Sequence, residues 1–302
     1  MDAQIEPSDT ANASASHAAE IEARQRFPFG ANWARFLHNL DASRIETAER
    51  SLIDWLSTPS LQGMRFLDAG SGSGLFSLAA HRLGAQVHSF DFDPQSVACT
   101  RELRRRQLAG DLPGALLVGK SSAEAAAWLV EEGSVLDPSY LCGLGQFDVV
   151  YSWGVLHHTG DMWTAIHNAS ERVAPGGRLF IAIYNDQGWM SQWWTGVKRR
   201  YNRSVFWRCL FISLYTPYYI WARVLYWKLR GHGSTERGMS LWYDLLDWLG
   251  GYPFEVARPE TVFDFLASRG FELRKLFTAG DKLGCNQFVF ERVRNAAKPQ
   301  IG

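Results

Sequence analysis

The sequence has few cysteines, no net charge and no long uninterrupted apolar run. The 302 residues include four scattered cysteines with no C-x-x-C pair: Cys99, Cys142, Cys209 and Cys285. This pattern excludes a disulfide framework or a zinc-binding cysteine pair as the organising element, and it is typical of reduced cytoplasmic thiols. The formal net charge of zero gives no global indication of nucleic-acid binding.

Secretion and membrane-spanning signals are also lacking. Residues 1–26 are rich in Ala, Ser and acidic residues and contain no apolar signal-peptide core, so they predict a disordered tail of a cytoplasmic protein. The longest uncharged aromatic run, Cys209 to Ala222, is shorter than the roughly 20 residues that a membrane helix needs, and it contains Pro217. We therefore predict no membrane span.

From residue 27 to residue 302 the pattern predicts one domain in which strands and helices alternate, which indicates an α/β fold with a parallel sheet covered on both faces. The predicted strands are Met64–Ala69, Gln86–Phe90, Trp128–Glu132, Phe147–Ser152, Gly177–Asn185, Phe271–Thr278 and Asn286–Arg292. The predicted helices are Ser43–Leu56, Leu75–Leu83, Pro94–Gln107, Asp161–Val173 and Pro259–Ser268. Ala115–Val118 also resembles a strand, so the region before Trp128 has two readings.

A glycine- and serine-rich loop joins the first strand to the second helix in "FLDAGSGSGLFSLAA", Phe66 to Ala80. Glycine tolerates positive φ and lets a ligand approach the backbone, and the new helix offers unpaired N–H groups. In an open parallel sheet such a loop lies where ligands bind, and Asp91 follows about 20 residues later, at the interval at which an acid reaches ribose hydroxyls.

The loop does not fit a dinucleotide. Its sixth position is Leu75 or Ser77 instead of glycine, which breaks the G-x-G-x-x-G fingerprint. Asp68, two residues before the first glycine, would repel a pyrophosphate but accommodate loop N–H groups or a cationic ligand group. We therefore predict a cationic nucleoside.

Four segments in order, "FLDAGSGSG", "FDFDP", "EEGSVLD" and "FDVVYSWGVLHHTGD", resemble the class I S-adenosylmethionine-dependent methyltransferases. The resemblance covers about Arg65 to Arg292. It implies a Rossmann-like, doubly wound, mostly parallel seven-stranded sheet with an antiparallel last strand, and S-adenosyl-L-methionine as the cofactor. The cofactor-binding positions that it implies are Asp68, Gly70, Ser71, Gly72, Gly74, Asp91, Phe92, Ser134, Val135, Ser152 and Trp153.

The resemblance also implies a role for these positions. The glycine loop would surround the methionine part of the cofactor, Asp91 the ribose, and Ser134 with Val135 the adenine. Ser134 stands where many members carry an acid, so Asp137 is an alternative adenine partner. Asp93 and Asp137 are otherwise predicted as helix N-caps.

His157 and His158 follow the fourth strand, at the edge where the cofactor's methyl group would emerge. Imidazole titrates near neutral pH, so both are candidate general bases for deprotonating an acceptor. Neighbouring side chains are expected to point apart, and we favour His158. The alternative is that either histidine bonds a carbonyl group or caps the next helix. No third ligand stands at a recognisable spacing, so no metal site is predicted.

Residues 186–256 interrupt the alternating pattern after the fifth strand and are expected to form a helical, aromatic-rich lid or insertion. Eight basic residues occur between Asp186 and Glu236 with no acid among them. Three readings compete: a pocket lid, a membrane-surface helix pair through residues 189–230, and a self-packed hairpin or homodimer surface. Candidate acceptor-binding residues are Tyr184, Trp189 and Tyr252, and the aromatics of Phe27 to Trp33 are candidates to fold back over the cofactor. For most of these rings, core packing is the expected role.

Taken together, the sequence predicts a cytoplasmic S-adenosylmethionine-dependent methyltransferase of a small-molecule acceptor with an O, N or S nucleophile. A peripheral-membrane methyltransferase of a lipophilic, quinone-like acceptor is the main variant. A non-catalytic nucleotide-binding protein is the alternative from another class. The broken fingerprint argues against a nicotinamide oxidoreductase, and RNA binding is a minor option because the chain is neutral overall.

Overall fold

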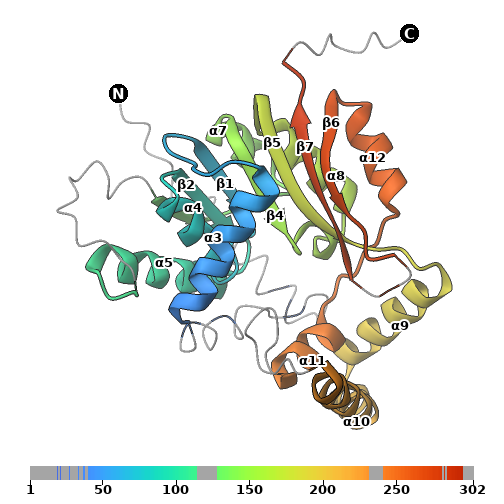
Figure 1. The fold of residues 1–302 in the computed structure, drawn as a ribbon. Helices are drawn as coiled ribbons and strands as arrows, with labels where there is room; N and C mark the ends of the chain where they lie inside the picture. Colours follow the sequence, from blue (N-terminus) through green and yellow to red (C-terminus); the bar gives the residue numbers. More distant parts are fainter. Residues whose placement is uncertain are drawn as a thin grey trace.

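A computed structural model describes residues 40–113, 128–230, 241–280, 282 and 284–294, with the single residues 19, 21, 27, 33 and 37. Its centre is one seven-stranded sheet in the order β3-β2-β1-β4-β5-β7-β6 (Figure 1). The strands are β1 (Arg65–Ala69), β2 (Gln86–Asp91), β3 (Trp128–Glu132), β4 (Phe147–Trp153), β5 (Val173–Tyr184), β6 (Phe271–Phe277) and β7 (Cys285–Arg292).

The direction of the strands confirms the predicted fold class. Strands β1 to β5 pair in parallel, whereas β7 runs antiparallel to both β5 and β6. The chain builds outward from β1 to β3 and then returns to place β4 on the other side of β1. The strand order therefore reverses between β1 and β4, which is where open α/β sheets bind their ligands.

The fifth strand begins earlier than predicted. We expected a helix to continue to Val173 and the strand to begin at Gly177, but Val173 already pairs with Phe147 and the pairing then shifts register. A Cβ at Gly177 would lie 2.9 Å from the carbonyl oxygens of Ala174 and Asp148. Glycine thus permits a close approach of the backbones at an irregular point of the strand. The sequence at this point resembles a turn, so it did not predict the earlier start of the strand.

Helices cover both faces of the sheet, as predicted. They are α3 (Ala42–Leu56), α4 (Leu75–Arg82), α5 (Pro94–Ala109), α7 (Pro138–Leu144), α8 (Met162–Glu171) and α12 (Pro259–Ala267). The sequence did not predict α7, which has only seven residues. Both acid caps are confirmed: Asp93 accepts from the Gln95 N–H at the start of α5, and Asp137 accepts from Ser139 and Tyr140 at the start of α7.

Two apolar cores hold the layers together. On one face α3, α4 and α5 pack on the sheet, with Ile45, Leu52 and Phe66 fully buried. On the other face α7, α8 and α12 pack on it, with Leu179 and Phe288 fully buried (Figure 1). Since each strand of the sheet centre contributes to both cores, the edge that carries the strand ends is fixed from two sides.

The insertion after β5 forms helices α9 (Trp189–Arg203), α10 (Val205–Arg230) and α11 (Leu241–Gly250), which pack on one another. They share a third, smaller apolar cluster that includes Val197, Tyr201, Phe211 and Leu249. In Figure 1 they lie together beyond one end of the sheet. None of the helices among the described residues is long and apolar enough to cross a membrane.

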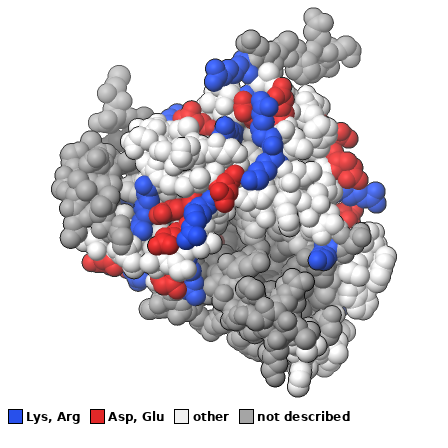
Figure 2. Space-filling model, in the orientation of Figure 1, with Lys and Arg blue, Asp and Glu red and all other residues white. Residues whose placement is uncertain are grey.

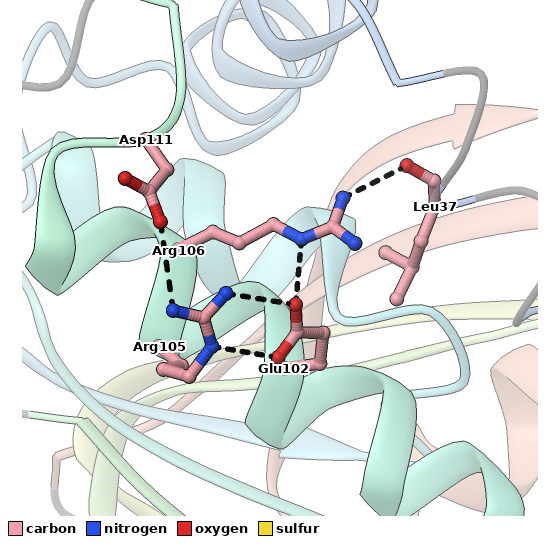
Figure 3. A network of polar contacts seen from close by, with 5 residues as sticks. All are labelled: Leu37, Glu102, Arg105, Arg106 and Asp111. Carbon is pink, nitrogen blue, oxygen red and sulfur yellow. Dashed lines mark hydrogen bonds and ion pairs between the residues drawn. The ribbon is translucent and has the colours of Figure 1, made fainter.

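A polar network joins α5 to the segment before α3 (Figure 3). Glu102 accepts hydrogen bonds from Arg105 and Arg106, and these bonds lower the pKa of its carboxyl group to about 2. Arg106 also donates to the Leu37 carbonyl at 3.2 Å, and Arg105 pairs with Asp111 at 3.5 Å. The network therefore links Leu37 to α5, the helix that follows β2.

Several expectations fall outside the described residues. They are the tail 1–26 apart from residues 19 and 21, the segment Ala115–Val118, residues 231–240 of the insertion, and residues 28–32 of the aromatic segment.

Candidate functional site

The glycine loop leaves β1 at the point of strand reversal. Gly70, Gly72 and Gly74 have φ values of 89°, 54° and 79°, a region that side-chain-bearing residues rarely adopt. The Gly70 and Ser71 N–H groups both donate to the Phe90 carbonyl at the end of β2, at 2.9 and 3.1 Å. The loop is thus attached to the neighbouring strand before α4 begins at Leu75.

Two neighbours press closely on this loop. A Cβ at Gly70 would lie 2.4 Å from a methyl carbon of Val155, which follows β4. A Cβ at Gly72 would lie 3.2 Å from the indole of Trp33. The Trp33 ring therefore lies against the loop, and it also packs on the apolar core of the α3–α5 face. Its contact with a bound cofactor stays a prediction.

Asp91 ends β2 and braces the loop directly. Its Oδ2 accepts the Gly72 N–H at 2.9 Å, and its Oδ1 accepts the Asp93 N–H at 2.9 Å. Phe92 follows and is half-buried. These two bonds fix the orientation of the Asp91 carboxylate at the end of β2.

Asp68 lies beneath the loop and is 2% exposed. Its carboxyl group accepts the hydroxyl proton of Ser77 on α4, Ser77 contacts the Ser89 hydroxyl at 2.7 Å, and Trp128 Nε1 donates to Ser89 at 2.9 Å. Burial raises the pKa of Asp68 to about 7, and the charge of Asp91 adds to the rise while the Ser77 bonds oppose it. The carboxyl group therefore changes charge near neutral pH, and a nearby cation would favour its ionised form.

The third strand contributes the candidate adenine side. The Gly133 N–H donates to the Asp91 carbonyl at 3.0 Å, which holds the ends of β2 and β3 together. The Ser134 hydroxyl accepts the Leu136 N–H at 3.2 Å. Val135 is 7% exposed and packs in the core on the α7–α8 face. These two residues stand at the predicted strand end, and their contact with adenine stays a prediction.

The fourth strand carries Ser152 and Trp153 to the same edge. Ser152 is fully buried and donates its hydroxyl proton to the Ala69 carbonyl at 2.7 Å, which links the ends of β4 and β1. Trp153 donates from Nε1 to the Gln287 side chain at 3.1 Å. Gly154, with φ 76°, then turns the chain toward the histidines.

His157 and His158 lie in a short 3-10 helix, Leu156–His158, and both are buried. We expected their rings to point apart, but the ring centroids are 4.5 Å apart and both rings contact Tyr184, at 4.0 Å for His157 and 5.5 Å for His158. The tight turn brings consecutive side chains round to one partner, which an extended segment would not do.

The chain that returns from the insertion fixes these histidines. His158 Nδ1 lies 2.5 Å from the Pro253 carbonyl oxygen, so that nitrogen carries the proton of the neutral ring and Nε2 is the acceptor nitrogen. A bond to a carbonyl group was one form of the alternative to the general-base prediction, and His158 makes such a bond. The other, a helix cap, falls to Asp161, which accepts the Thr164 N–H.

Glu255 strengthens the same junction. Its backbone N–H donates to the His157 carbonyl at 3.0 Å, and its carboxylate accepts the Gly160 and Met162 N–H groups at 3.0 and 3.1 Å. Burial raises the pKa of its carboxyl group, and those two hydrogen bonds oppose the rise. Glu255 thus holds the histidine turn from the segment in which the insertion ends, and the Pro253 carbonyl had no sequence signal because any residue supplies one.

The three candidate acceptor residues separate in the structure. Tyr184 lies beside the histidines, and Tyr252 is half-buried in the return segment, where its carbonyl accepts the Phe27 N–H at 3.0 Å. Trp189 is 72% exposed at the start of α9. The geometry therefore supports Tyr184 as part of the site and leaves Trp189 on the surface of the insertion.

Aromatic rings continue from Tyr184 into the insertion. Tyr184 contacts Phe254 at 5.1 Å and Trp248 at 5.9 Å between centroids, and Trp248 contacts Trp194 at 5.3 Å. The buried Lys198 ammonium lies 4.4 Å from the Trp248 ring centroid and donates to the Trp248 carbonyl. Among the residues that the structure describes, no group of three His, Cys, Asp or Glu side chains forms a metal site.

Reversed strand order, a glycine-rich strand-to-helix loop and an acid at the next strand end together define a nucleoside-binding α/β protein. The profile of the methyltransferase domain family matches residues 40–234, which is more than half of the chain. The chain belongs to this family, the class I S-adenosylmethionine-dependent methyltransferases.

Curated methyltransferases are similar in sequence to parts of this chain. A ubiquinone biosynthesis O-methyltransferase of Xanthomonas oryzae pv. oryzae (strain PXO99A) is 30% identical over 149 residues, 49% of this chain and 52% of the relative. Ribosomal protein L11 methyltransferase of Methylococcus capsulatus is 47% identical over 60 residues, 20% of each chain. The chain thus spans about half the length of the first relative and a fifth of the second.

A solved structure of similar fold is the magnesium protoporphyrin IX methyltransferase of Synechocystis PCC 6803 with bound SAH. It is 14% identical, covers 82% of this chain and 83% of its own, and has a TM-score of 0.46.

Proposed function

We propose that this protein transfers a methyl group from S-adenosylmethionine to a small-molecule acceptor, with His158 as the general base. One observation carries the proposal. The loop of β1, braced by Asp91 of β2, and the histidine turn after β4 lie at adjacent strand ends, on the two sides of the strand reversal. A donor held on the first side would thus present its reactive group toward the second.

The residues present fit such a donor. Asp68 and Asp91 are close enough for the charge of one to raise the pKa of the other, so the pocket edge favours a cation over a pyrophosphate. The loop from Gly70 to Gly74 would hold the methionine part, with Ser152 and Trp153 beside it. Asp91 would accept the ribose hydroxyls, with Phe92 next to it, and Ser134 and Val135 would flank the adenine. The bound donor supplies a methyl group that is already activated on a sulfonium.

His158 would remove the acceptor's proton. The hydrogen bond from Nδ1 to the Pro253 carbonyl fixes the ring orientation and leaves the lone pair on Nε2, which would accept a proton from a hydroxyl, thiol or ammonium group. Tyr184 packs against both histidines and limits their rotation. Positioning and proton removal are the main tasks left to the protein, because the donor carries the activation.

The second candidate function concerns a lipophilic, quinone-like acceptor. The rings of Tyr184, Phe254, Trp248 and Trp194 follow one another from the histidines into the insertion, and apolar rings are the usual lining of a small-molecule pocket. The similarity to a ubiquinone biosynthesis O-methyltransferase supports this candidate. A peripheral contact through residues 189–230 would then give access to an acceptor dissolved in lipid.

Isothermal titration with S-adenosylmethionine and with its demethylated product tests the cofactor half, and transfer of a labelled methyl group to hydrophilic and lipophilic phenols, thiols and amines tests the reaction. Binding of both cofactor forms together with labelled product supports the proposal. Binding without transfer to any acceptor class would favour the non-catalytic nucleotide-binding alternative, and no binding would reject both.

A further inference from the structure

We propose that one exposed face of α10 docks the protein on the surface of an anionic lipid bilayer. This face, called the α10 stripe, consists of Phe206, Leu210, Leu214, Trp221 and Leu225. The inference deepens the second candidate function, a lipophilic acceptor, and rests on it for the reason why membrane contact would be useful. The contact itself depends on the surface of α10 and on the basic residues of α9.

Helical spacing places the α10 stripe on a single face. Its members are separated by four, four, seven and four residues, which keeps them within one side of a helix. Their exposed fractions are 70% for Phe206, 42% for Leu210, 61% for Leu214, 74% for Trp221 and 57% for Leu225. Large apolar side chains are thus exposed along most of the helix.

This exposed face is separate from the face that α10 packs against its neighbours. Trp207, Phe211 and Tyr215, also four residues apart, contribute to the apolar cluster of the insertion. Phe211 stacks on Trp207 at a centroid distance of 5.6 Å and is only 8% exposed. The helix therefore already has its packing partners in α9 and α11, and the α10 stripe is not needed for that core.

The stripe is long and lies at the outer end of the molecule. A helix of 26 residues is about 39 Å long, and in Figure 1 α10 lies beyond α9 and α11, away from the sheet. On α9, Trp189 and Trp193 are also exposed, at 72% and 58%. Large exposed apolar side chains gathered on one part of a surface commonly mark a contact with a protein or a membrane.

Charge complementarity identifies a lipid surface as the occupant. Arg199, Arg200, Arg203 and Arg208 are exposed on α9 and α10, and the sequence has no acid between Asp186 and Glu236. Over the α/β body, by contrast, basic and acidic side chains are interspersed (Figure 2). Aromatic and aliphatic side chains flanked by arginine are the composition of helices that lie in the headgroup region of anionic bilayers.

Two other occupants fit less well. A second copy in a two-fold contact would bring the same basic segment against itself, since such an interface uses one patch twice. Single-stranded nucleic acid stacks its bases on aromatic rings, and three of the five stripe residues are leucines without a ring. Insertion across the bilayer is not supported by any helix that the structure describes.

Vesicle flotation of the full chain tests the proposal. We expect the protein to float with vesicles of phosphatidylcholine and phosphatidylglycerol, and to bind phosphatidylcholine alone at least about tenfold more weakly because the arginines then lack a partner. The double variant Leu210→Glu with Leu214→Glu should lose about tenfold or more of the binding. Its control is Phe263→Glu with Leu276→Glu, two exposed apolar residues outside the insertion, 41% and 43% exposed on α12 and β6.

Two natural cysteines provide a second readout. Cys209 is exposed on α10, beside the stripe, and Cys142 is exposed on α7. An environment-sensitive dye placed on Cys209 in a Cys142→Ser chain should shift to the blue when anionic vesicles are added. The same dye on Cys142 in a Cys209→Ser chain should not respond.

The outcomes separate this inference from the proposed function. Cofactor affinity by calorimetry serves as the folding control. If the double leucine variant no longer binds cofactor, and so fails this folding control, the double variant Arg199→Gln with Arg200→Gln replaces it. That variant must then weaken flotation. Four outcomes would each overturn the inference. The first two are that the unmodified chain does not bind anionic vesicles, and that stripe and control variants lose binding equally. The other two are a dimer that Leu210→Glu dissociates, and retention of RNA without lipid binding. Vesicle binding by a chain that fails to bind cofactor would reject the proposed function alone.

Discussion

The α/β body builds its candidate site mainly from backbone groups, whereas the helical insertion builds its surfaces from side chains. In the body, the candidate cofactor site is built from backbone groups: three glycines with positive φ and N–H groups bonded to Phe90 and Asp91. In the insertion, side chains dominate: one set of rings forms its interior, whereas arginines and a second set of large apolar side chains are exposed. A backbone site suits one constant ligand, whereas a side-chain surface can be altered by single substitutions without disturbing the fold.

The histidine turn lies where the two regions meet. It follows β4 of the body, yet Pro253 and Glu255 of the returning chain hold it in place. The base would therefore respond to both regions, and substitutions can show whether donor binding and acceptor chemistry are separable.

The largest effect is expected at His158. Because the base acts only on the acceptor, His158→Ala should lower turnover by about 10²- to 10⁴-fold while cofactor affinity stays within about twofold. Steady-state kinetics and calorimetry on the same preparation measure the two. His167→Ala, on the exposed side of α8, is the matched control. Full turnover without His158 would remove it from the mechanism.

Asp91 should show the opposite separation. Asp91→Ala removes the acceptor of the Gly72 N–H and the expected partner of the ribose, so cofactor affinity should fall about 100-fold, or roughly 2.7 kcal/mol. Asp41→Ala removes the N-cap of α3, whose bond goes to the Arg44 N–H, and should cost about 1 kcal/mol of stability without changing affinity. Calorimetry decides, and unchanged affinity in Asp91→Ala means that the ribose assignment is wrong.

A third test addresses the backbone of the body. Gly70→Ala combines a positive φ of 89° with a Cβ placed 2.4 Å from Val155, so we expect a loss of about 1–3 kcal/mol in the free energy of unfolding. Gly143→Ala, where nothing lies within 4 Å of the added Cβ, should be neutral or slightly stabilising. Equal stability of the two variants in urea melts would show that the loop is not tightly packed.

The same division explains which features the sequence could predict. Loop chemistry and strand periodicity are local, so the glycine turn, Asp91 and the caps Asp93 and Asp137 were predicted from spacing alone. Contacts between distant segments were not. The aromatics of "FPFGANW" suggested a segment near the cofactor but did not show that Trp33 would meet Gly72, and a carbonyl such as that of Pro253 has no distinctive residue type.

Irregular backbone set the other limits of prediction. The predicted start of β5 was wrong because the glycine and proline residues there are typical of a turn. In the structure, Gly177 allows a close approach between strands. The histidines were expected to diverge, whether the segment was extended or turning, and the 3-10 helix instead brings both rings into contact with Tyr184. The exposure of Trp189 likewise depends on how α9 packs, which its spacing does not define.

Asp68 should make the body, not the insertion, sensitive to pH. Its folded pKa of about 7 exceeds the ordinary 3.8, so the stability that its proton contributes is complete below pH 3.8 and is lost as the pH rises through 7. A cationic donor favours the ionised form, so affinity should increase about tenfold from pH 6 to pH 8. Calorimetry at both pH values should show this in the unmodified chain and in His158→Ala, and no change in Asp68→Asn. A persisting pH dependence in Asp68→Asn would assign it to another group.

The smallest effect should come from the anchor of the N-terminal segment (Figure 3). Arg106 donates to the Leu37 carbonyl, four residues after Trp33, and Trp33 lies against Gly72. Arg106→Gln loses that bond, so the ring should be held less firmly and cofactor affinity should fall about two- to fivefold, the effect of one hydrogen bond. Arg105→Gln loses bonds only to Glu102 and Asp111 and should leave affinity unchanged. Equal affinities would mean that Trp33 holds its place through the apolar core alone.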